Sequence, residues 1–140
     1  MNAPLYTTEI LRLAASLGEP RALSHEDGSA ELRSPTCGSR VAATVQLNPK
    51  GQVEALSQQV HACAFGQASA AVLERGAIGR SRDEVQTALA ELDAWLGGSD
   101  AVPGWPGLAA LAPARSRKSR HGAILLPYRA LLAAIEAADV

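Results

Sequence analysis

Residues 41–63, VAATVQLNPKGQVEALSQQVHAC, contain two strand-like stretches joined by a tight turn. From Val41 to Leu47, apolar residues alternate with smaller or more polar ones, which is the pattern of a half-buried strand. Asn48-Pro49-Lys50-Gly51 predicts a turn, because proline presets φ and glycine accepts a positive φ. Val53 to His61 is then expected to return as the next strand. This hairpin decides the predicted fold.

A third strand is expected just before the hairpin, over residues 29–34, where the alternation is weaker. The three strands together predict an antiparallel meander, with Cys37 in its first turn and Cys63 just beyond its last strand. The middle strand leads away from Cys37 and the third strand returns. We therefore expect both cysteines at the same end of the sheet.

After Cys63 the spacing of apolar residues changes to that of a helix. Phe65, Ala68, Ala71 and Val72 form one stripe, and Gly76 and Gly79 follow it. Cys63 is therefore expected at or just before a helix N-terminus. Unpaired N–H groups and the helix dipole favour a thiolate at such a position.

Capping signals predict further helices on either side. Thr7 or Thr8 is expected to cap a first helix, which Gly18 would end. Ser81-Arg82-Asp83-Glu84 is a capping box that opens another helix, which Gly97-Gly98 would close.

The C-terminal third of the chain carries weaker signals. We expect a short helical segment at 108–111, a basic loop over 113–120, and a last helix from about His121 to Ala138. Pro127 is expected in the first turn of that helix, where its missing N–H costs little. The sequence thus predicts one α+β domain over residues 1–140, a three-stranded antiparallel sheet with helices packed on one face.

The composition excludes several classes of protein. The 140 residues carry a net charge of −1, which gives no general attraction to nucleic acid or to an anionic membrane. The apolar runs are too short to span a bilayer, and the N-terminus has no secretory pattern. Two cysteines without a disulfide framework favour a reducing, cytoplasmic location. With 47% hydrophobic but only 4% aromatic residues, the core should be rich in small side chains.

Cys37 and Cys63 are the candidate metal ligands. Their spacing matches no zinc-finger or redox motif, and spacing alone favours two unrelated, buried cysteines. The predicted meander favours ligation because it brings them together. His121 is a candidate third ligand through a neutral ring nitrogen, or else an exposed histidine in a basic loop.

Other polar residues leave alternatives open. His61, on a strand two residues before Cys63, is another candidate ligand, and His25 is expected to be solvated. The cluster Arg115, Arg117, Lys118 and Arg120 fits either a solvated face or a site for phosphate or an acidic partner. No phosphate-binding loop, H-E-x-x-H, G-x-S-x-G or catalytic carboxylate pair is visible in the sequence.

Three short segments, in this order, resemble the IscU/SufU (NifU N-terminal) iron–sulfur scaffold family. They are Thr36-Cys37-Gly38, Cys63-Ala64-Phe65-Gly66 at the start of an Ala- and Ser-rich helix, and Arg120-His121-Gly122-Ala123-Ile124-Leu125. The resemblance covers nearly the whole chain. The long segment 77–120 resembles the insertion of the SufU branch, whereas the histidine at 121 resembles the IscU branch.

The resemblance also implies a set of ligands, which this chain keeps only in part. Family members carry three cysteines and an aspartate. The first two cysteines fall on Cys37 and Cys63, the aspartate on Ser39 and the third cysteine on Gly122. A [2Fe–2S] cluster requires four protein ligands, usually thiolates, and Ser39 is a poor substitute for a carboxylate. Cys37, Cys63 and His121 are still suited to hold one zinc or iron ion with an open fourth position.

The function implied by the resemblance is that of a carrier, not an enzyme. A cysteine desulfurase would deliver sulfur as a persulfide on Cys37 or Cys63, and apo-proteins would receive the assembled iron–sulfur cluster. Two alternatives remain. The first is a ligand-depleted paralogue that binds or regulates a partner protein without a cluster, and the second is a sulfur-relay enzyme that works through one cysteine.

Overall fold

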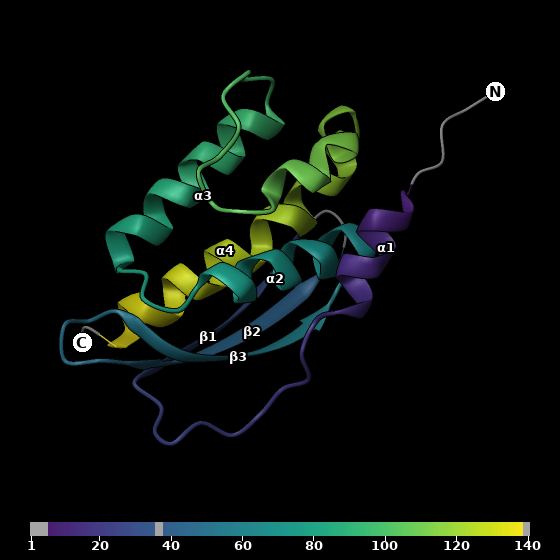
Figure 1. Ribbon diagram of the computed structural model, residues 1–140. Coiled ribbons are helices and arrows are strands. Elements are labelled where there is room, and N and C mark those ends of the chain that lie inside the picture. Colours follow the sequence, from purple (N-terminus) through teal and green to yellow (C-terminus); the bar gives the residue numbers. More distant parts are fainter. Residues whose placement is uncertain (1–5, 36–37, 139–140) are drawn as a thin grey trace.

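The computed structural model describes residues 6–35 and 38–138, and it has the predicted α+β architecture (Figure 1). Three strands, four α-helices and one 3₁₀ helix, η1, are present in the described residues. In chain order they are α1 (Thr8–Ala15), β1 (Gly28–Arg33), β2 (Arg40–Leu47), β3 (Val53–His61), α2 (Ala64–Gly76), α3 (Arg82–Leu96), η1 (Leu108–Ser116) and α4 (Lys118–Ala138).

The sheet is the predicted antiparallel meander, in the order β1-β2-β3. Gly28 pairs with Val45 at one end of the β1–β2 ladder, and Arg40 pairs with His61 at the opposite end of the β2–β3 ladder. The turn at 48–51 forms as expected, with Gly51 at a φ of +79° and its N–H donating to the Asn48 carbonyl. The hairpin prediction is confirmed.

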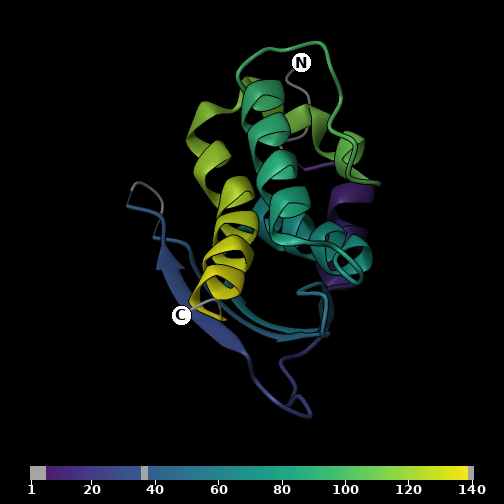
Figure 2. The same ribbon diagram turned by 90° about the vertical axis from the view of Figure 1, so that its left-hand side faces the viewer.

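Helices cover one face of the sheet in two layers. Helices α2 and α4 lie against the strands, and α1 packs beside α2 (Figure 1). Helix α3 and η1 form an outer layer over α2 and α4. In the turned view this outer layer lies on the side of α2 and α4 that faces away from the sheet (Figure 2). Helix α4 approaches β1 so closely that a Cβ at Gly28 would overlap the Ala134 carbonyl oxygen. Glycine is therefore required at the start of β1.

The core is rich in small side chains, as the composition predicts. Ala68, Ala70 and Ala71 of α2 are all fully buried, which lets this helix lie close to its neighbours. Two aromatic pairs fill the larger spaces. Trp105 meets Tyr128 edge-on at 5.2 Å between ring centroids, and Tyr6 packs against Phe65 at 4.9 Å.

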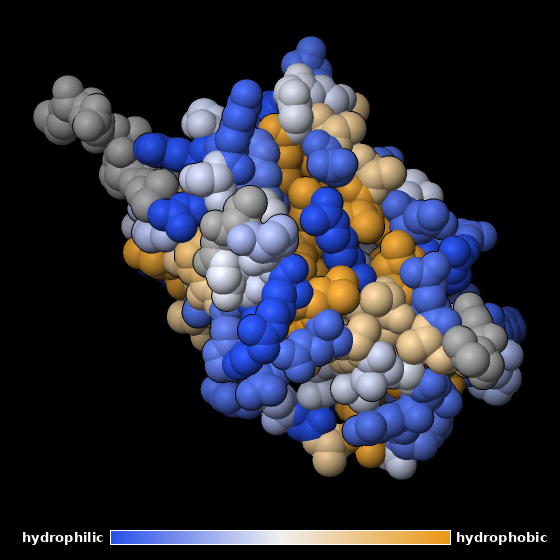
Figure 3. All heavy atoms as spheres, turned by 180° about the vertical axis from the view of Figure 1, so that it is seen from behind, coloured by the Kyte–Doolittle hydropathy of each residue, from blue (hydrophilic) through white to orange (hydrophobic). Residues whose placement is uncertain are grey.

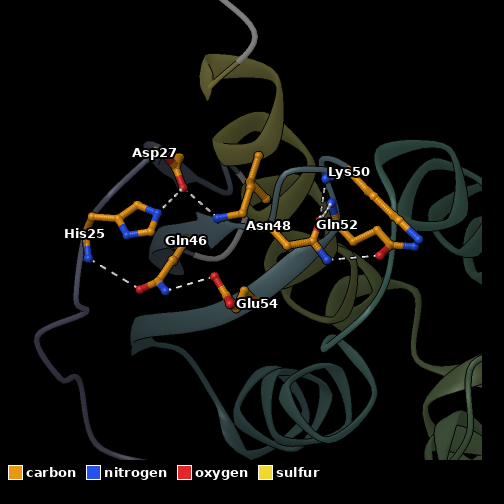
Figure 4. Close-up of polar contacts among 8 residues, drawn as sticks. His25, Asp27, Gln46, Asn48, Lys50, Gln52 and Glu54 are labelled. Carbon is orange, nitrogen blue, oxygen red and sulfur yellow. Dashed lines mark hydrogen bonds and ion pairs between the residues drawn. The ribbon is translucent and has the colours of Figure 1, made fainter.

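The other face of the sheet carries no helix among the described residues, but the segment between α1 and β1 runs along it (Figure 1). The close-up shows how this segment is attached (Figure 4). Asp27 accepts the Leu47 N–H at 2.6 Å and lies 3.0 Å from the His25 ring. The His25 N–H donates to the Gln46 side chain, which in turn donates to Glu54. These polar contacts attach the segment to β2 and β3.

The prediction for the last helix is wrong in two respects. The helix begins at Lys118, and Pro127 lies in its interior. Because proline has no N–H, the Ala123 carbonyl four residues earlier receives no helical hydrogen bond. Proline in a helix interior costs about 3 kcal/mol. Burial of the residues around it, such as Ile124 and Leu131, holds the helix together across this break.

Two further boundaries differ from the predictions. Residues 113–116 belong to η1, and 118–120 to α4, so the expected basic loop over 113–120 is wrong. Helix α1 ends at Ala15 with Ser16 as its cap, and not at Gly18. Gly18 instead donates its N–H to the Glu74 carboxylate at 2.8 Å. At Gly18 this tertiary contact takes the place of the expected helix end.

The surface is mixed in character. Seen from behind, on the side of β1 and α4, apolar surface gathers near the middle between polar side chains (Figure 3). Among the described helices, none is long and apolar enough to cross a membrane.

Candidate functional site

Cys63 is the N-cap residue of α2, as predicted. Its backbone is extended, with φ −67° and ψ 173°, and its thiol makes no capping hydrogen bond. The Gln67 N–H donates to the Cys63 carbonyl, and the Gln67 side chain donates to the Ala62 carbonyl at 3.0 Å. These bonds hold the turn from β3 into α2 and leave the half-buried sulfur without a partner in the helix cap.

The register of the sheet places this turn beside the β1–β2 turn. Arg40 begins β2 and pairs with His61, the last residue of β3. The end of β3, from which the chain continues to Cys63, therefore lies at the same end of the sheet as the start of β2. The β1–β2 turn enters β2 at this end. Cys37, the other predicted thiol ligand, lies outside the described residues.

The described part of the β1–β2 turn is closed by main-chain bonds. The Ser34 N–H donates to the Ser39 carbonyl at 2.8 Å, and the Gly38 N–H donates to the Ser34 carbonyl at 3.2 Å. Gly38 has a φ of +72°, a conformation that favours glycine. Ser39 is only 4% exposed, so its hydroxyl lies at a buried position directly before β2.

Helices α2 and α4 meet close to Cys63. A Cβ on Gly66 would lie 2.6 Å from the Ala62 Cβ and 3.2 Å from the Ala123 carbonyl oxygen. One turn further along α2, the buried Ser69 hydroxyl donates to the Ile124 carbonyl at 2.6 Å. The first turn of α2 thus packs on the residues that directly follow Gly122.

His121 lies in the first turn of α4, but one of its ring nitrogens is already engaged. Nε2 lies 2.9 Å from the Ala114 carbonyl oxygen and 3.1 Å from that of Arg115. The half-buried ring also lines a hollow of about 620 Å³ between the end of α3 and the start of α4. Lining residues include Leu96, Gly98, Arg115 and Lys118.

The other polar candidates have different surroundings. His61 is exposed on β3, and His25, expected to be solvated, forms an ion-pair contact with Asp27. Of the basic cluster, Arg115 bonds to main-chain carbonyls, whereas Arg117 and Lys118 are exposed and form no ion pair with a described residue. No local sequence pattern indicates this role of Arg115, because its partners Trp95 and Ser99 lie in α3 and just after it.

Within residues 6–35 and 38–138, no three His, Cys, Asp or Glu side chains lie close enough together to hold a metal. A three-ligand site at this end of the sheet would therefore need Cys37 besides Cys63 and His121.

Comparison with solved structures places this arrangement among known folds. The N-terminal domain of a nitrogen-fixing NifU-like protein from Brucella abortus superposes with a TM-score of 0.86 at 29% identity, over 96% of this chain and 94% of that one. This likeness supports the resemblance of the chain to the IscU/SufU (NifU N-terminal) family.

Other solved structures share the fold. A putative SUF-system iron–sulfur cluster assembly scaffold protein from Fervidobacterium islandicum AW-1 superposes with a TM-score of 0.82 at 18% identity, over 94% of this chain and 96% of that one. A hypothetical protein gives a TM-score of 0.70 at 20% identity, over 91% and 96% of the two chains. No protein-family profile and no curated protein matches the sequence.

Cys63 lies at the start of α2, and His121 lies in the first turn of α4. The sequence resemblance predicts the family aspartate at Ser39 and the third family cysteine at Gly122. Ser39 lies at the β1–β2 turn, and Gly122 directly precedes the α2–α4 contact. Both departures therefore fall at the same end of the sheet as Cys63.

Proposed function

We propose that this protein is a divergent iron–sulfur cluster assembly scaffold. It would bind zinc, iron or a labile [2Fe–2S] cluster through Cys37, Cys63 and His121, and it would act as a carrier and not as an enzyme. Its partners would be a cysteine desulfurase and the apo-proteins that receive the cluster. Two cysteines without a disulfide framework also support a cytoplasmic location.

The observation that carries the proposal is the position of Cys63. This thiol stands at the N-cap of α2, beside the sheet end where the chain turns from β1 into β2. The same end lies close to the first turns of α4, through the contact of Gly66 with Ala123. A scaffold that must receive and release a cluster needs its ligands on short turns held by rigid elements.

Sulfur transfer to such a thiol needs no external oxidant or reductant. A thiolate of this chain attacks the terminal sulfur of the donor's persulfide. One S–S bond forms on Cys37 or Cys63, another breaks, and the donor leaves as a thiolate.

The test is metal and acid-labile sulfide analysis of protein purified without oxygen. Wild type is expected to hold about one equivalent of metal, and Cys37→Ala and Cys63→Ala are expected to lose it while keeping the far-UV circular dichroism of the fold. Sulfide that accompanies iron would identify a cluster scaffold. Wild type that is well folded but contains neither metal nor sulfide after reconstitution would contradict the proposal.

A second function is favoured by the altered ligand positions. Ser39 and Gly122 replace two groups that the family uses, and the His121 Nε2 is occupied by main-chain carbonyls. These observations support a ligand-depleted paralogue that binds or regulates a partner. Both functions predict binding to a desulfurase, so a binding assay does not separate them. Metal content separates the two functions, because the ligand-depleted paralogue is expected to bind no metal.

A further inference from the structure

The two carbonyl oxygens beside the His121 ring determine where its proton lies. A main-chain carbonyl only accepts hydrogen bonds, so both contacts of Nε2 require a proton on that nitrogen. Turning the ring by 180° would place a C–H group against the carbonyls and lose both bonds. The neutral ring is therefore protonated at Nε2 and has its lone pair on Nδ1.

The main chain that carries the Ala114 and Arg115 carbonyls is anchored by the side chain of Arg115, which bonds two other carbonyls. Its Nε donates to the Trp95 carbonyl at 2.9 Å, and one Nη donates to the Ser99 carbonyl at 2.7 Å. The guanidinium also lies over the Trp95 ring, 5.1 Å from its centroid. These bonds use one carbonyl in the last turn of α3 and one just after the helix, where a positive charge is favourable. Arg115 thus joins the end of η1 to the end of α3.

We propose that Arg115 is a positioning residue that holds His121 in the Nε2-protonated tautomer and so makes Nδ1 its ligating atom. The tautomer is a property of the metal-free protein, while the ligating role rests on the proposed function. A hydrogen bond on one ring nitrogen commonly sets which nitrogen binds a metal and how basic it is. Through the bonds of Arg115, α3 and η1 would help to orient the His121 ring at the proposed site.

The test is two-bond ¹H–¹⁵N correlation spectroscopy on metal-free protein with ¹⁵N-labelled histidine at about pH 8. His25→Gln and His61→Gln assign the His121 resonances. Wild type is expected to show a protonated Nε2 and an unprotonated Nδ1. Arg115→Ala is expected to give a mixture of tautomers. Arg115→Lys is expected to behave similarly, because an ammonium group does not reproduce the planar fork that spans the Trp95 and Ser99 carbonyls.

Arg117→Ala is the matched control, since Arg117 is exposed and is expected to leave the tautomer unchanged. Circular dichroism of each variant checks that the fold is retained. An Nδ1-protonated ring in wild type, or an unchanged Nε2-protonated ring in folded Arg115→Ala and Arg115→Lys, would overturn the inference.

A zinc titration of the same samples separates this inference from the proposed function. Zinc is expected to shift the Nδ1 resonance of wild type, and Arg115→Ala is expected to bind zinc about tenfold more weakly, the usual effect of losing such an outer contact. A zinc-induced shift at Nε2 would overturn the assignment of the ligating atom. An Nε2-protonated ring that zinc does not affect would support the positioning role and count against the proposed metal site.

Discussion

Arg40 of β2 lies directly opposite His61 of β3, at the end of the sheet from which both cysteine-bearing turns leave. Cys63 follows His61 by two residues, and Cys37 precedes Arg40 by three. One antiparallel register therefore relates two turns that are far apart in sequence. The turn that carries Cys63 therefore begins at the end of the sheet where β2 starts, and Cys37 itself lies outside the described residues.

Gly66→Ala is expected to separate the first turn of α2 from α4. The new methyl group would lie 2.6 Å from the Ala62 Cβ and against the main chain of Ala123. Overpacking of this kind costs about 1 to 3 kcal/mol. In urea denaturation, Gly66→Ala should have a lower midpoint than wild type. The metal content of the variant should also be lower.

Gly104→Ala is the control for this substitution, because the nearest atom to a new Cβ there is the Glu91 Oε1 at 3.7 Å. Equal midpoints for the two variants would mean that the α2–α4 contact is not tightly packed.

Ser69→Ala tests the hydrogen bond that joins α2 to α4. The Ser69 hydroxyl is fully buried and donates to Ile124 at 2.6 Å, next to the Ala123 carbonyl that Pro127 leaves without a helical partner. Its loss is expected to lower the free energy of unfolding by about 1 kcal/mol. Chemical denaturation measures the change. Ser119→Ala, on the exposed side of α4, should not reproduce it; a similar loss there would rule out a specific role for Ser69.

Ser81→Ala is expected to weaken the start of α3. Ser81 accepts the Glu84 N–H, and Glu84 accepts the Ser81 N–H in return. Loss of a serine cap costs about 1 kcal/mol. Thermal unfolding should show a lower midpoint, whereas Ser24→Ala, at an exposed position outside any helix, should leave it unchanged.

The same capping box predicts a pH dependence. The hydrogen bond from the Ser81 main chain, followed by the Ser81 hydroxyl and Arg80, holds the pKa of Glu84 below its ordinary value of 4.5. A lowered folded-state pKa means that the unfolded chain binds more protons near this pH. The contribution of Glu84 is present above pH 4.5 and is lost as the pH falls through the folded-state pKa. Acid unfolding of Glu84→Gln should lack the loss of stability that protonation of Glu84 causes in wild type. Identical profiles of stability against pH for the variant and wild type would contradict the prediction.

Tyr128→Phe is expected to leave the fold intact and to stabilise it by about 1 kcal/mol. The Tyr128 hydroxyl is fully buried and has no hydrogen-bond partner among the described residues, so its desolvation is uncompensated. Thermal unfolding checks the change. Tyr6→Phe is the control, because Tyr6 is only partly buried. A destabilised Tyr128→Phe would show that the hydroxyl has a partner after all.

Burial also raises the pKa of Tyr128 well above its ordinary value of 10.0. Above pH 10 the unfolded tyrosine releases its proton while the folded one retains it, so the unfolded state binds fewer protons. Wild-type stability should then fall as the pH rises above 10. Denaturation of wild type and Tyr128→Phe at pH 9 and 11 measures this, and the variant should lose less stability. Equal losses would contradict a buried neutral tyrosine.

Sequence alone determined the hairpin, the capping box and the place of Cys63 at a helix N-terminus, because each depends on residues close together in the chain. Alternation between Val41 and Leu47, the turn at 48–51 and the serine–glutamate exchange at 81–84 are all local signals. They were enough to predict the three-stranded meander.

Only the tertiary structure decided where α4 begins, why Gly28 is required and what His121 contacts. Pro127 argues locally for a helix start, but buried neighbours hold α4 together across it. Gly28 has the carbonyl of Ala134 against it, and the His121 ring meets carbonyls that Arg115 ties to α3. These contacts join segments distant in the chain. Such close approaches depend on the packing of whole elements, and local sequence patterns do not encode them.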